Sequence, residues 1–144
     1  MLLLAMVLAL AAGSALARLV IRSRRIVVHG FSMAPTLLPG DRLVVVPAGK
    51  PRIGDLITLP DPRQPERLLV KRVVSIDPST ATVMVAGDNV DASTGSATFG
   101  PVAWRTVLGR ATYCYFPRAR AGRLARRGDI ESSAGSHVLR SSQR

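Results

Sequence analysis

Residues 26–117 form a series of short aliphatic and β-branched runs separated by turns rich in glycine and proline. These runs are residues 26–29, 42–46, 55–59, 67–76, 82–86 and 107–116. Such runs are typical of β-strands, and no stretch after residue 26 shows the periodicity of an amphipathic helix. Strands joined by turns of this kind form compact barrels or sandwiches. We therefore predict one mainly β domain at residues 26–117, in a chain of 144 residues that has room for one core.

An uncharged apolar segment, residues 2–17, precedes the predicted domain. As a helix this segment would be about 24 Å long, and extending it past Arg18 to Ile21 brings it close to the roughly 30 Å of a bilayer core. We predict that residues 1–21 form one N-terminal transmembrane helix that anchors the protein. A cleavable signal peptide is the alternative, because Ala15-Leu16-Ala17 fits the small-residue cleavage pattern. Against cleavage, no lysine or arginine precedes the apolar run.

The formal net charge is +11, and arginine supplies every basic residue except Lys50 and Lys71. Four arginines at residues 18–25 follow the apolar segment, and the positive-inside tendency would place the rest of the chain in the cytoplasm. Residues 118–144 are again rich in arginine, with serine and glycine toward the end. We predict that they form a basic, disordered tail, or one that rests on anionic lipid.

One serine lies in a segment of small and turn-forming residues, Gly30-Phe31-Ser32-Met33-Ala34-Pro35-Thr36-Leu37, which ends at Gly40-Asp41. Small residues on both sides let another backbone approach the Ser32 hydroxyl closely. A serine becomes a nucleophile when a neighbouring base takes its proton. The sequence around Ser32 therefore raises the question of which residue is the base.

Lys71 is the candidate base, within the apolar run Leu68-Leu69-Val70-Lys71-Arg72-Val73-Val74. In a strand, Lys71 shares a face with Leu69 and Val73, whereas Arg72 lies on the opposite face. If that face is the core, desolvation lowers the pKa of Lys71, and the neutral amine can take the Ser32 proton. Taken alone, the two residues also fit a turn serine and an edge-strand lysine.

Three segments together resemble the type I signal peptidase family, whose members are serine peptidases with a Ser/Lys dyad. Ser32-Met33-Ala34-Pro35-Thr36-Leu37 with Gly40-Asp41 is similar to the family's nucleophile box, and Val70-Lys71-Arg72-Val73 is similar to its general-base box. Gly87-Asp88-Asn89 through Phe99-Gly100-Pro101-Val102 resembles the last box. The resemblance spans about residues 26–117. It implies a compact all-β catalytic domain with an apolar surface on the membrane, Ser32 as nucleophile and Lys71 as general base.

The resemblance also implies supporting roles and shows departures. Ser93 matches a serine that helps to orient the lysine amine, although it could be an ordinary turn serine. Gly30 stands where some members have a serine that assists the oxyanion hole, which leaves the Ser32 backbone N–H as the donor that we can name. The acid and the arginine of the last box are absent, because Gly95 and Ala97 replace them. The other matched positions have structural roles: Met33, Pro35, Gly40, Asp41, Gly87, Asp88 and Asn89.

Other candidate residues have weaker support. His29 is near Ser32, but a Ser/His/Asp site needs an acid to orient the imidazole, and the sequence indicates none. Asp88 and Asn89 fit turn formation better than acid–base chemistry. Cys114 fits a buried structural thiol. We predict no metal and no cofactor, because the sequence has neither a ligand cluster at metal spacing nor a glycine-rich phosphate loop.

Three functions remain open at this point. The leading one is a membrane-bound, signal peptidase I-like endopeptidase that removes N-terminal signal peptides after small residues from exported proteins. The second is a dedicated maturation protease of the same family that acts on one propeptide, for example that of a nickel superoxide dismutase. The third is a non-catalytic basic module bound to membrane or nucleic acid, which the net charge favours but the few aromatic residues do not.

The leading function implies protein substrates with small residues before the cleavage site and contact with membrane lipid, and no nucleic acid partner. It also implies a single-pass protein of the cell membrane with an extracytoplasmic catalytic domain, whereas the arginines after the apolar segment favour the cytoplasmic face. The natural substrate, the membrane orientation, the second oxyanion donor and the oligomeric state do not follow from the sequence.

Overall fold

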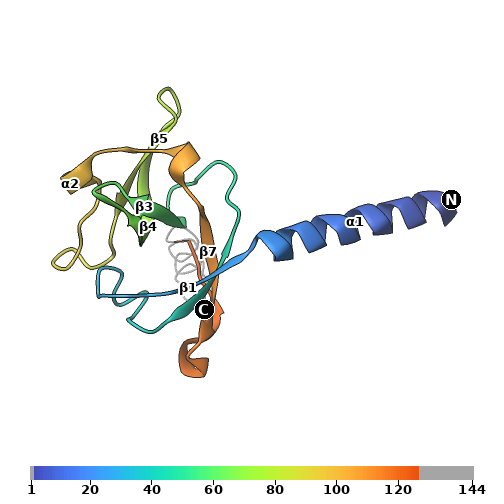
Figure 1. The fold of residues 1–144 in the computed structure, drawn as a ribbon, viewed down its shortest axis with the longest axis horizontal. Coiled ribbons are helices and arrows are strands. Elements are labelled where there is room, and N and C mark those ends of the chain that lie inside the picture. The colour runs from blue at the N-terminus through green and yellow to red at the C-terminus, as the bar shows by residue number, and fades with distance from the viewer. Residues whose placement is uncertain (1, 127–144) are drawn as a thin grey trace, which may run out of the picture.

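The computed structural model describes residues 2–126 and, within the first helix, the side chains of residues 4–14. A long helix leads into a β domain that contains one short helix and two 3-10 turns (Figure 1). The elements are α1 (Leu2–Arg22), β1 (Arg24–Val27), β2 (Arg42–Val46), β3 (Leu56–Asp61), β4 (Gln64–Asp77), β5 (Thr82–Ala86), α2 (Ser96–Phe99), β6 (Val102–Ala103), η1 (Trp104–Thr106), β7 (Gly109–Phe116), η2 (Arg118–Arg120) and β8 (Gly122–Arg123).

The strands form an antiparallel sheet in the order β1-β2-β7-β3-β4-β5-β6, and β8 pairs with β7. The mainly β fold predicted from the turn and strand pattern is therefore confirmed. The last long strand, β7, is an interior strand of this order, where it pairs with β2 on one side and with β3 on the other. Strands from both ends of the sequence therefore meet beside the β3–β4 hairpin.

Two clusters of buried aliphatic side chains fill the domain. One joins the segment after β1 to β2 and β7, and its buried members are Val28, Met33, Leu37, Leu43, Val45, Leu56, Ala111 and Cys114. The other lies over β3, β4 and β5, and its buried members are Ile57, Leu59, Leu69, Val73, Val83, Val85 and Val102. The first cluster holds the chain around Ser32, and the second surrounds the strand that carries Lys71.

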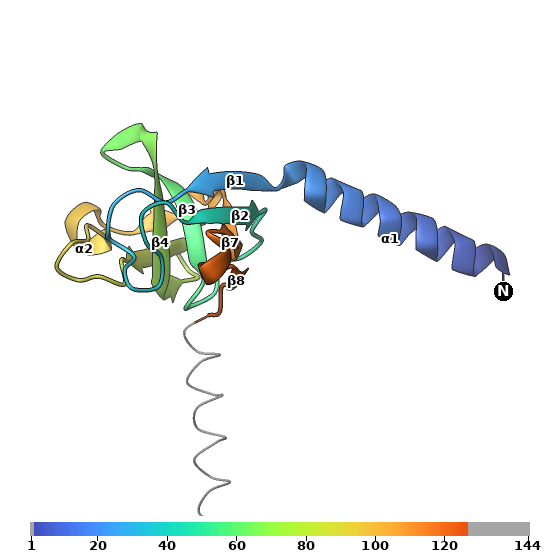
Figure 2. The same ribbon diagram turned by 90° about the horizontal axis from the view of Figure 1, so that it is seen from below.

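The N-terminal segment forms the helix α1, which projects away from the β domain in both views (Figures 1 and 2). Among the residues that the structure describes, no helix is both long enough and apolar enough to cross a bilayer. The transmembrane helix predicted for residues 1–21 is therefore not supported. The uncharged run ends at Ala17, short of the roughly 20 apolar residues that a spanning helix needs.

Residues 118–126 contact the β domain, although the sequence analysis placed them in a disordered tail. Arg120 donates from Nε and Nη2 to the Asp41 carboxylate at 3.0 to 3.2 Å, and Nη2 also donates to the Thr36 carbonyl at 3.1 Å. β8 pairs with β7, and Leu124 packs against the first core cluster. The rest of the predicted tail, residues 127–144, lies outside the described residues.

We expect a chain that ends at Pro117 to lose roughly 2–3 kcal/mol of unfolding free energy. It lacks the Arg120 bonds to a buried carboxylate, whose loss costs about this much, as well as β8 and the Leu124 packing. Urea denaturation measures the difference. A chain that ends at Arg126 keeps all of these contacts and is the matched control, so it should unfold at a higher urea concentration than the chain that ends at Pro117. Equal stability of the two truncated chains would contradict a structural role for residues 118–126.

Candidate active site

Ser32 lies in a loop, residues 29–40, that backbone hydrogen bonds close at its base. The Val28 N–H donates to the Asp41 carbonyl at 2.8 Å, and the Gly40 N–H donates to the Val28 carbonyl at 3.0 Å. Within the loop the Leu37 N–H donates to the Met33 carbonyl at 2.9 Å, and both side chains are buried in the first core cluster. Ser32 itself is half-buried. The buried side chains of Met33 and Leu37 thus hold the loop on the core, while the neighbouring Ser32 stays partly exposed.

Glycine and aspartate shape this loop. Gly30 and Gly40 adopt positive φ values of 74° and 89°, a backbone region that glycine enters without steric cost. Asp41 is 1% exposed and accepts hydrogen bonds from the Leu38 N–H and from Arg120. Burial disfavours the charged carboxylate, but these hydrogen bonds outweigh burial, so the pKa of Asp41 is lowered. Pro35 follows Ala34 through a cis peptide bond and is exposed.

Lys71 lies in the middle of β4, opposite Ile57 of β3, and is 1% exposed. Leu69 and Val73, its neighbours on the same strand face, are also buried. The Lys71 Nζ donates a hydrogen bond to Ser93 Oγ at 3.0 Å. Burial lowers the pKa of Lys71, the nearby Arg67 guanidinium lowers it further, and the Asp61 carboxylate partly opposes both. This arrangement favours a neutral amine.

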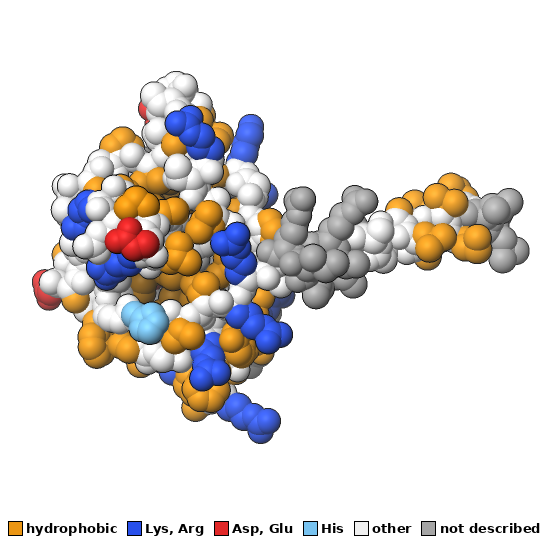
Figure 3. Space-filling view, viewed as in Figure 1, with side chains coloured by type: hydrophobic (Ala, Val, Ile, Leu, Met, Phe, Trp, Pro, Cys, Tyr) orange, Lys and Arg blue, Asp and Glu red, His pale blue; other side chains and the backbone are white. Residues whose placement is uncertain are grey.

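Ser32 and Lys71 line the same cavity, which has a volume of about 530 Å³. Its walls come from β1 and the residues after it, from the Ser32 loop and from β4, and they include Ile26, Val28, His29, Met33, Arg67, Leu69 and Thr94. His29 is exposed at this cavity, so the structure also brings the second candidate base to Ser32's surroundings. Figure 3 shows hydrophobic side chains exposed between Lys and Arg side chains on one face of the β domain.

Residues 87–89 connect the Ser32 loop to β4. The Asn89 N–H donates to the Ser32 carbonyl at 3.1 Å. A Cβ atom at Gly87 would overlap both the Ser32 carbonyl oxygen and Ser93 Oγ, so the position requires glycine. Asp88, which the sequence analysis assigned to a turn, instead accepts two hydrogen bonds from Arg72, at 2.7 and 2.6 Å. Gly87 therefore lies between Ser32 and Ser93, and Asp88 ties this segment to the strand of Lys71.

Several residues that support the site escaped the sequence analysis. The strand pattern predicts Arg72 on the face opposite Lys71 but does not identify its partner Asp88. Arg72 Nη1 also donates to the Gly54 carbonyl at 2.9 Å. Arg120 lies in the arginine-rich segment whose composition predicts a disordered tail. Asp61 and Arg63 form an ion pair at the end of the β3–β4 hairpin. The pairing of opposite charges could have suggested some of these contacts, but not which residues meet.

The described part of the chain contains no group of three or more His, Cys, Asp or Glu side chains placed to share a metal ion. Cys114 is buried, and its thiol donates to the Phe116 carbonyl at 3.2 Å. The cavity is lined by a hydroxyl, that of Ser32, and by the buried lysine Lys71.

Comparison with known proteins identifies the family. A model of the family "Signal peptidase, peptidase S26" matches residues 1–83, more than half of the chain, including Ser32 and Lys71. The chain belongs to the signal peptidase S26 family. The segment from Gly87 to Val102 lies beyond the matched range.

Curated relatives of this S26 family member carry protease names. It is 32% identical over 122 residues to the mitochondrial ATP-independent inner membrane protease subunit 1a of Arabidopsis thaliana, which covers 67% of this chain and 73% of the relative. It is 31% identical over 124 residues to the mitochondrial inner membrane protease subunit 2 of Schizosaccharomyces pombe, covering 70% and 69%. The mouse inner membrane protease subunit 2 is 29% identical over 121 residues, covering 67% and 69%. The family and these relatives make the chain a peptidase of the S26 type.

We expect Gly87→Ala to lower peptide hydrolysis by about 100-fold, because the added methyl group displaces Ser32 or Ser93 by a large fraction of an ångström or more. Initial rates on a peptide with alanine at the first and third positions before the cleavage site measure the effect. Gly49→Ala is the matched control, since nothing lies within 4 Å of a Cβ atom there. Full activity of the Gly87→Ala variant would show that this contact does not set the geometry of the site.

Proposed function

We propose that this protein is a membrane-associated serine endopeptidase that removes N-terminal signal peptides, with Ser32 as nucleophile and Lys71 as general base. The observation that carries the proposal is the environment of Lys71. Lys71 is 1% exposed, and its Nζ donates a hydrogen bond to Ser93 Oγ at 3.0 Å. Lys71 and Ser32 line the same cavity. The names of the relatives, which are inner membrane proteases, support both the protease activity and the membrane association.

In the proposed reaction the neutral Lys71 amine takes the proton of the Ser32 hydroxyl as Ser32 Oγ attacks the scissile carbonyl carbon. The carbonyl oxygen becomes an oxyanion, for which the Ser32 backbone N–H is our assigned donor. Collapse of this intermediate breaks the C–N bond, and the Lys71 ammonium gives its proton to the leaving amine. Water then attacks the acyl-enzyme carbonyl and gives a proton to Lys71. The bond between the carbonyl carbon and Ser32 Oγ breaks, the Lys71 ammonium returns the proton to Ser32 Oγ, and the product leaves with a new carboxyl group.

Ser93 has a positioning role in this scheme. Its hydroxyl oxygen accepts a hydrogen bond from the Lys71 Nζ, which fixes the direction of the amine at the end of a flexible side chain. The aliphatic lining of the cavity, with Ile26, Val28 and Leu69, suits small apolar substrate side chains. We therefore propose substrates with small residues before the cleavage site.

The direct test of the proposal is Ser32→Ala. This variant should lose hydrolysis of an Ala-x-Ala peptide while its unfolding midpoint stays at the wild-type value, because Ser32 is half-buried in a loop and outside both core clusters. Retained hydrolysis in the purified variant would end the assignment of the nucleophile.

Substitutions of Lys71 test whether it acts as a proton acceptor or only through its positive charge. Lys71→Arg keeps a cation of similar length but one that stays protonated, so we expect it to be as inactive as Lys71→Ala. Lys50 is the other of the two lysines in the sequence and is exposed, so Lys50→Arg is the matched control and should keep wild-type rates. Substantial activity of the Lys71→Arg variant would contradict the assignment of Lys71 as the general base, and His29 would then be the next residue to replace.

The pH dependence of kcat/KM should follow the ionisation of Lys71. Burial, Arg67 and Arg63 lower its pKa from the usual 10.5, and only the neutral amine accepts a proton, so the rate should rise with pH and level off below pH 10.5. Hydrolysis rates at low substrate concentration across this range give the profile. A rise centred on the ordinary lysine value would contradict the proposed role of burial.

A further inference from the structure

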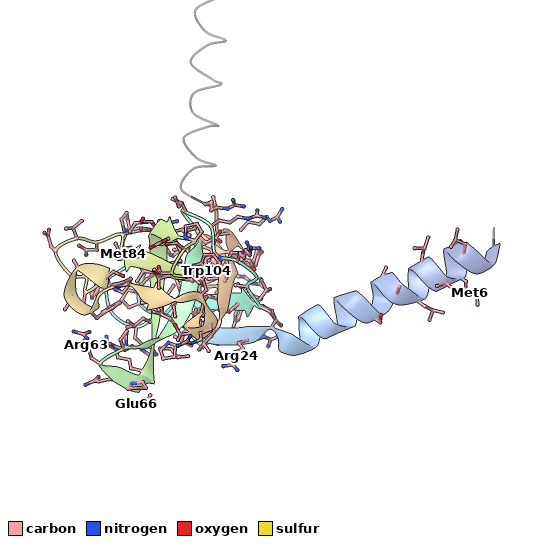
Figure 4. The ribbon with its side chains drawn as sticks, turned by 90° about the horizontal axis from the view of Figure 1, so that it is seen from above. Met6, Arg24, Arg63, Glu66, Met84 and Trp104 are labelled. Atoms are coloured by element: carbon pink, nitrogen blue, oxygen red, sulfur yellow. The ribbon has the colours of Figure 1, made fainter. Side chains whose placement is uncertain are left out.

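The β3–β4 hairpin brings an ion pair to the edge of the candidate active site. Asp61, the last residue of β3, is 1% exposed, and Arg63 follows it at the end of the hairpin (Figure 4). Arg63 Nε and Nη2 donate to the two carboxylate oxygens of Asp61 at 3.2 and 3.1 Å, and the Arg63 backbone N–H donates to Oδ1 at 3.0 Å. A buried carboxylate bonded in this bidentate way holds the guanidinium in one orientation.

The oriented guanidinium contacts the loop that carries Ser93. Arg63 Nη2 donates to Thr94 Oγ1 at 3.3 Å, and Thr94 directly follows Ser93. Residues 87–95 contain neither helix nor strand, so individual side-chain contacts decide where this loop lies. One end of the loop is held by the Asn89 bond to Ser32, and beyond its other end Ser96 Oγ accepts the Val85 N–H at 2.8 Å. The hydrogen bond from Arg63 holds the loop between these two points, at Thr94, next to the serine that contacts Lys71.

We infer that the Asp61–Arg63 pair positions Ser93: by holding Thr94, it keeps the Ser93 hydroxyl against the Lys71 amine. The last sequence box of this chain lacks an acid and an arginine, since Gly95 and Ala97 stand at those positions. The hairpin supplies one of each from a different part of the chain. The inference rests on the proposed function, because it gives Asp61 and Arg63 a role in orienting the general base.

The charges around Lys71 explain why a pair suits this position better than a lone acid. The charged groups that act on Lys71 are Asp61 and Arg63 of the hairpin and Arg67 of its own strand, and His29 lines the same cavity. Burial and Arg67 lower the pKa of Lys71, Asp61 raises it, and Arg63 lowers it again. An unpaired Asp61 would favour the ammonium, which cannot act as a base. With Arg63 bound to it, the carboxylate orients the loop while its effect on the amine is offset.

Thr94 gives the sharpest test, because it is exposed and its replacement does not disturb the core. Thr94→Val removes the hydroxyl that Arg63 contacts, and we expect kcat to fall about tenfold with little change in KM. Thr94→Ser keeps the hydroxyl and should restore the rate. At the alkaline plateau of the pH profile, where Lys71 is neutral in every variant, Arg63→Ala should lower kcat by a similar factor. There the double variant should be no slower than either single one, because both substitutions remove the same contact. Thr98→Val and Arg105→Ala, at exposed positions of α2 and η1, are the matched controls.

Two results would overturn the inference. One is a Thr94→Val variant as fast as Thr94→Ser. The other is a double variant whose loss is the product of the two single losses, since that would mean that Arg63 and Thr94 act independently.

A second readout does not require peptidase activity. Cyanate carbamylates neutral amines, so the rate of Lys71 modification at a fixed neutral pH, followed by mass spectrometry, reports its fraction of neutral amine, with Lys50 as internal reference. Asp61→Asn should raise this rate and Arg63→Ala should lower it, because the two charges act on Lys71 in opposite directions. Unchanged Lys71 rates in both variants would overturn the part of the inference in which the charges of the pair offset each other at the amine. If Ser32→Ala leaves hydrolysis intact, the proposed function fails, and the carbamylation rates still test the hairpin.

Discussion

The burial of one lysine amine is the constraint on which the rest of this structure depends. An ammonium group in an aliphatic core costs several kcal/mol unless it is paired, whereas a neutral amine with one hydrogen-bond acceptor can be accommodated. Lys71 has such an acceptor in Ser93, and aliphatic residues of β3 and β4 surround its stem. The sheet therefore lowers the pKa of this potential base by burying it, and no carboxylate is hydrogen-bonded to the amine in the described residues. Members of the S26 family are peptidases, and this environment gives the proposed peptidase chemistry a physical basis.

The groups around the amine come from four separate parts of the chain, and polar contacts fix them relative to one another. Gly87 lets the Ser32 loop and Ser93 approach each other, and the Arg72–Asp88 pair holds the intervening segment on β4. The Arg120–Asp41 pair closes the base of the Ser32 loop from the C-terminal side. The Asp41 carboxylate is buried, so removal of Arg120 would take the charged partner away from a buried carboxylate, at a large cost in stability. The geometry of the cavity thus depends on residues well outside it.

The sequence predicted what is set locally. Short apolar runs between turns predicted the β domain, strand alternation placed Lys71 and Arg72 on opposite faces, and the sequence boxes singled out Ser32 as the candidate nucleophile. Contacts across long stretches of chain could not be read in this way: Arg120 meets Asp41 across 79 positions, Arg63 meets Thr94 across 31, and Arg72 meets Asp88 across 16. The arginine-rich composition of residues 118–126 predicts a tail. It does not show that Arg120 binds Asp41, which lies far away in the sequence. The prediction that the apolar N-terminal run forms a helix is confirmed. A helix that spans a membrane needs a longer uncharged run than this segment has.

The most direct test of the account is the titration of Lys71 itself. With ¹³Cε-labelled lysine, the protein should give two lysine signals in an NMR titration, one from exposed Lys50 and one from Lys71, which Lys71→Arg assigns. The Lys71 midpoint should lie below the ordinary 10.5 and below that of Lys50, since burial is the largest influence on the pKa of Lys71 and lowers it. Coincident midpoints for the two lysines, near the ordinary value, would contradict it.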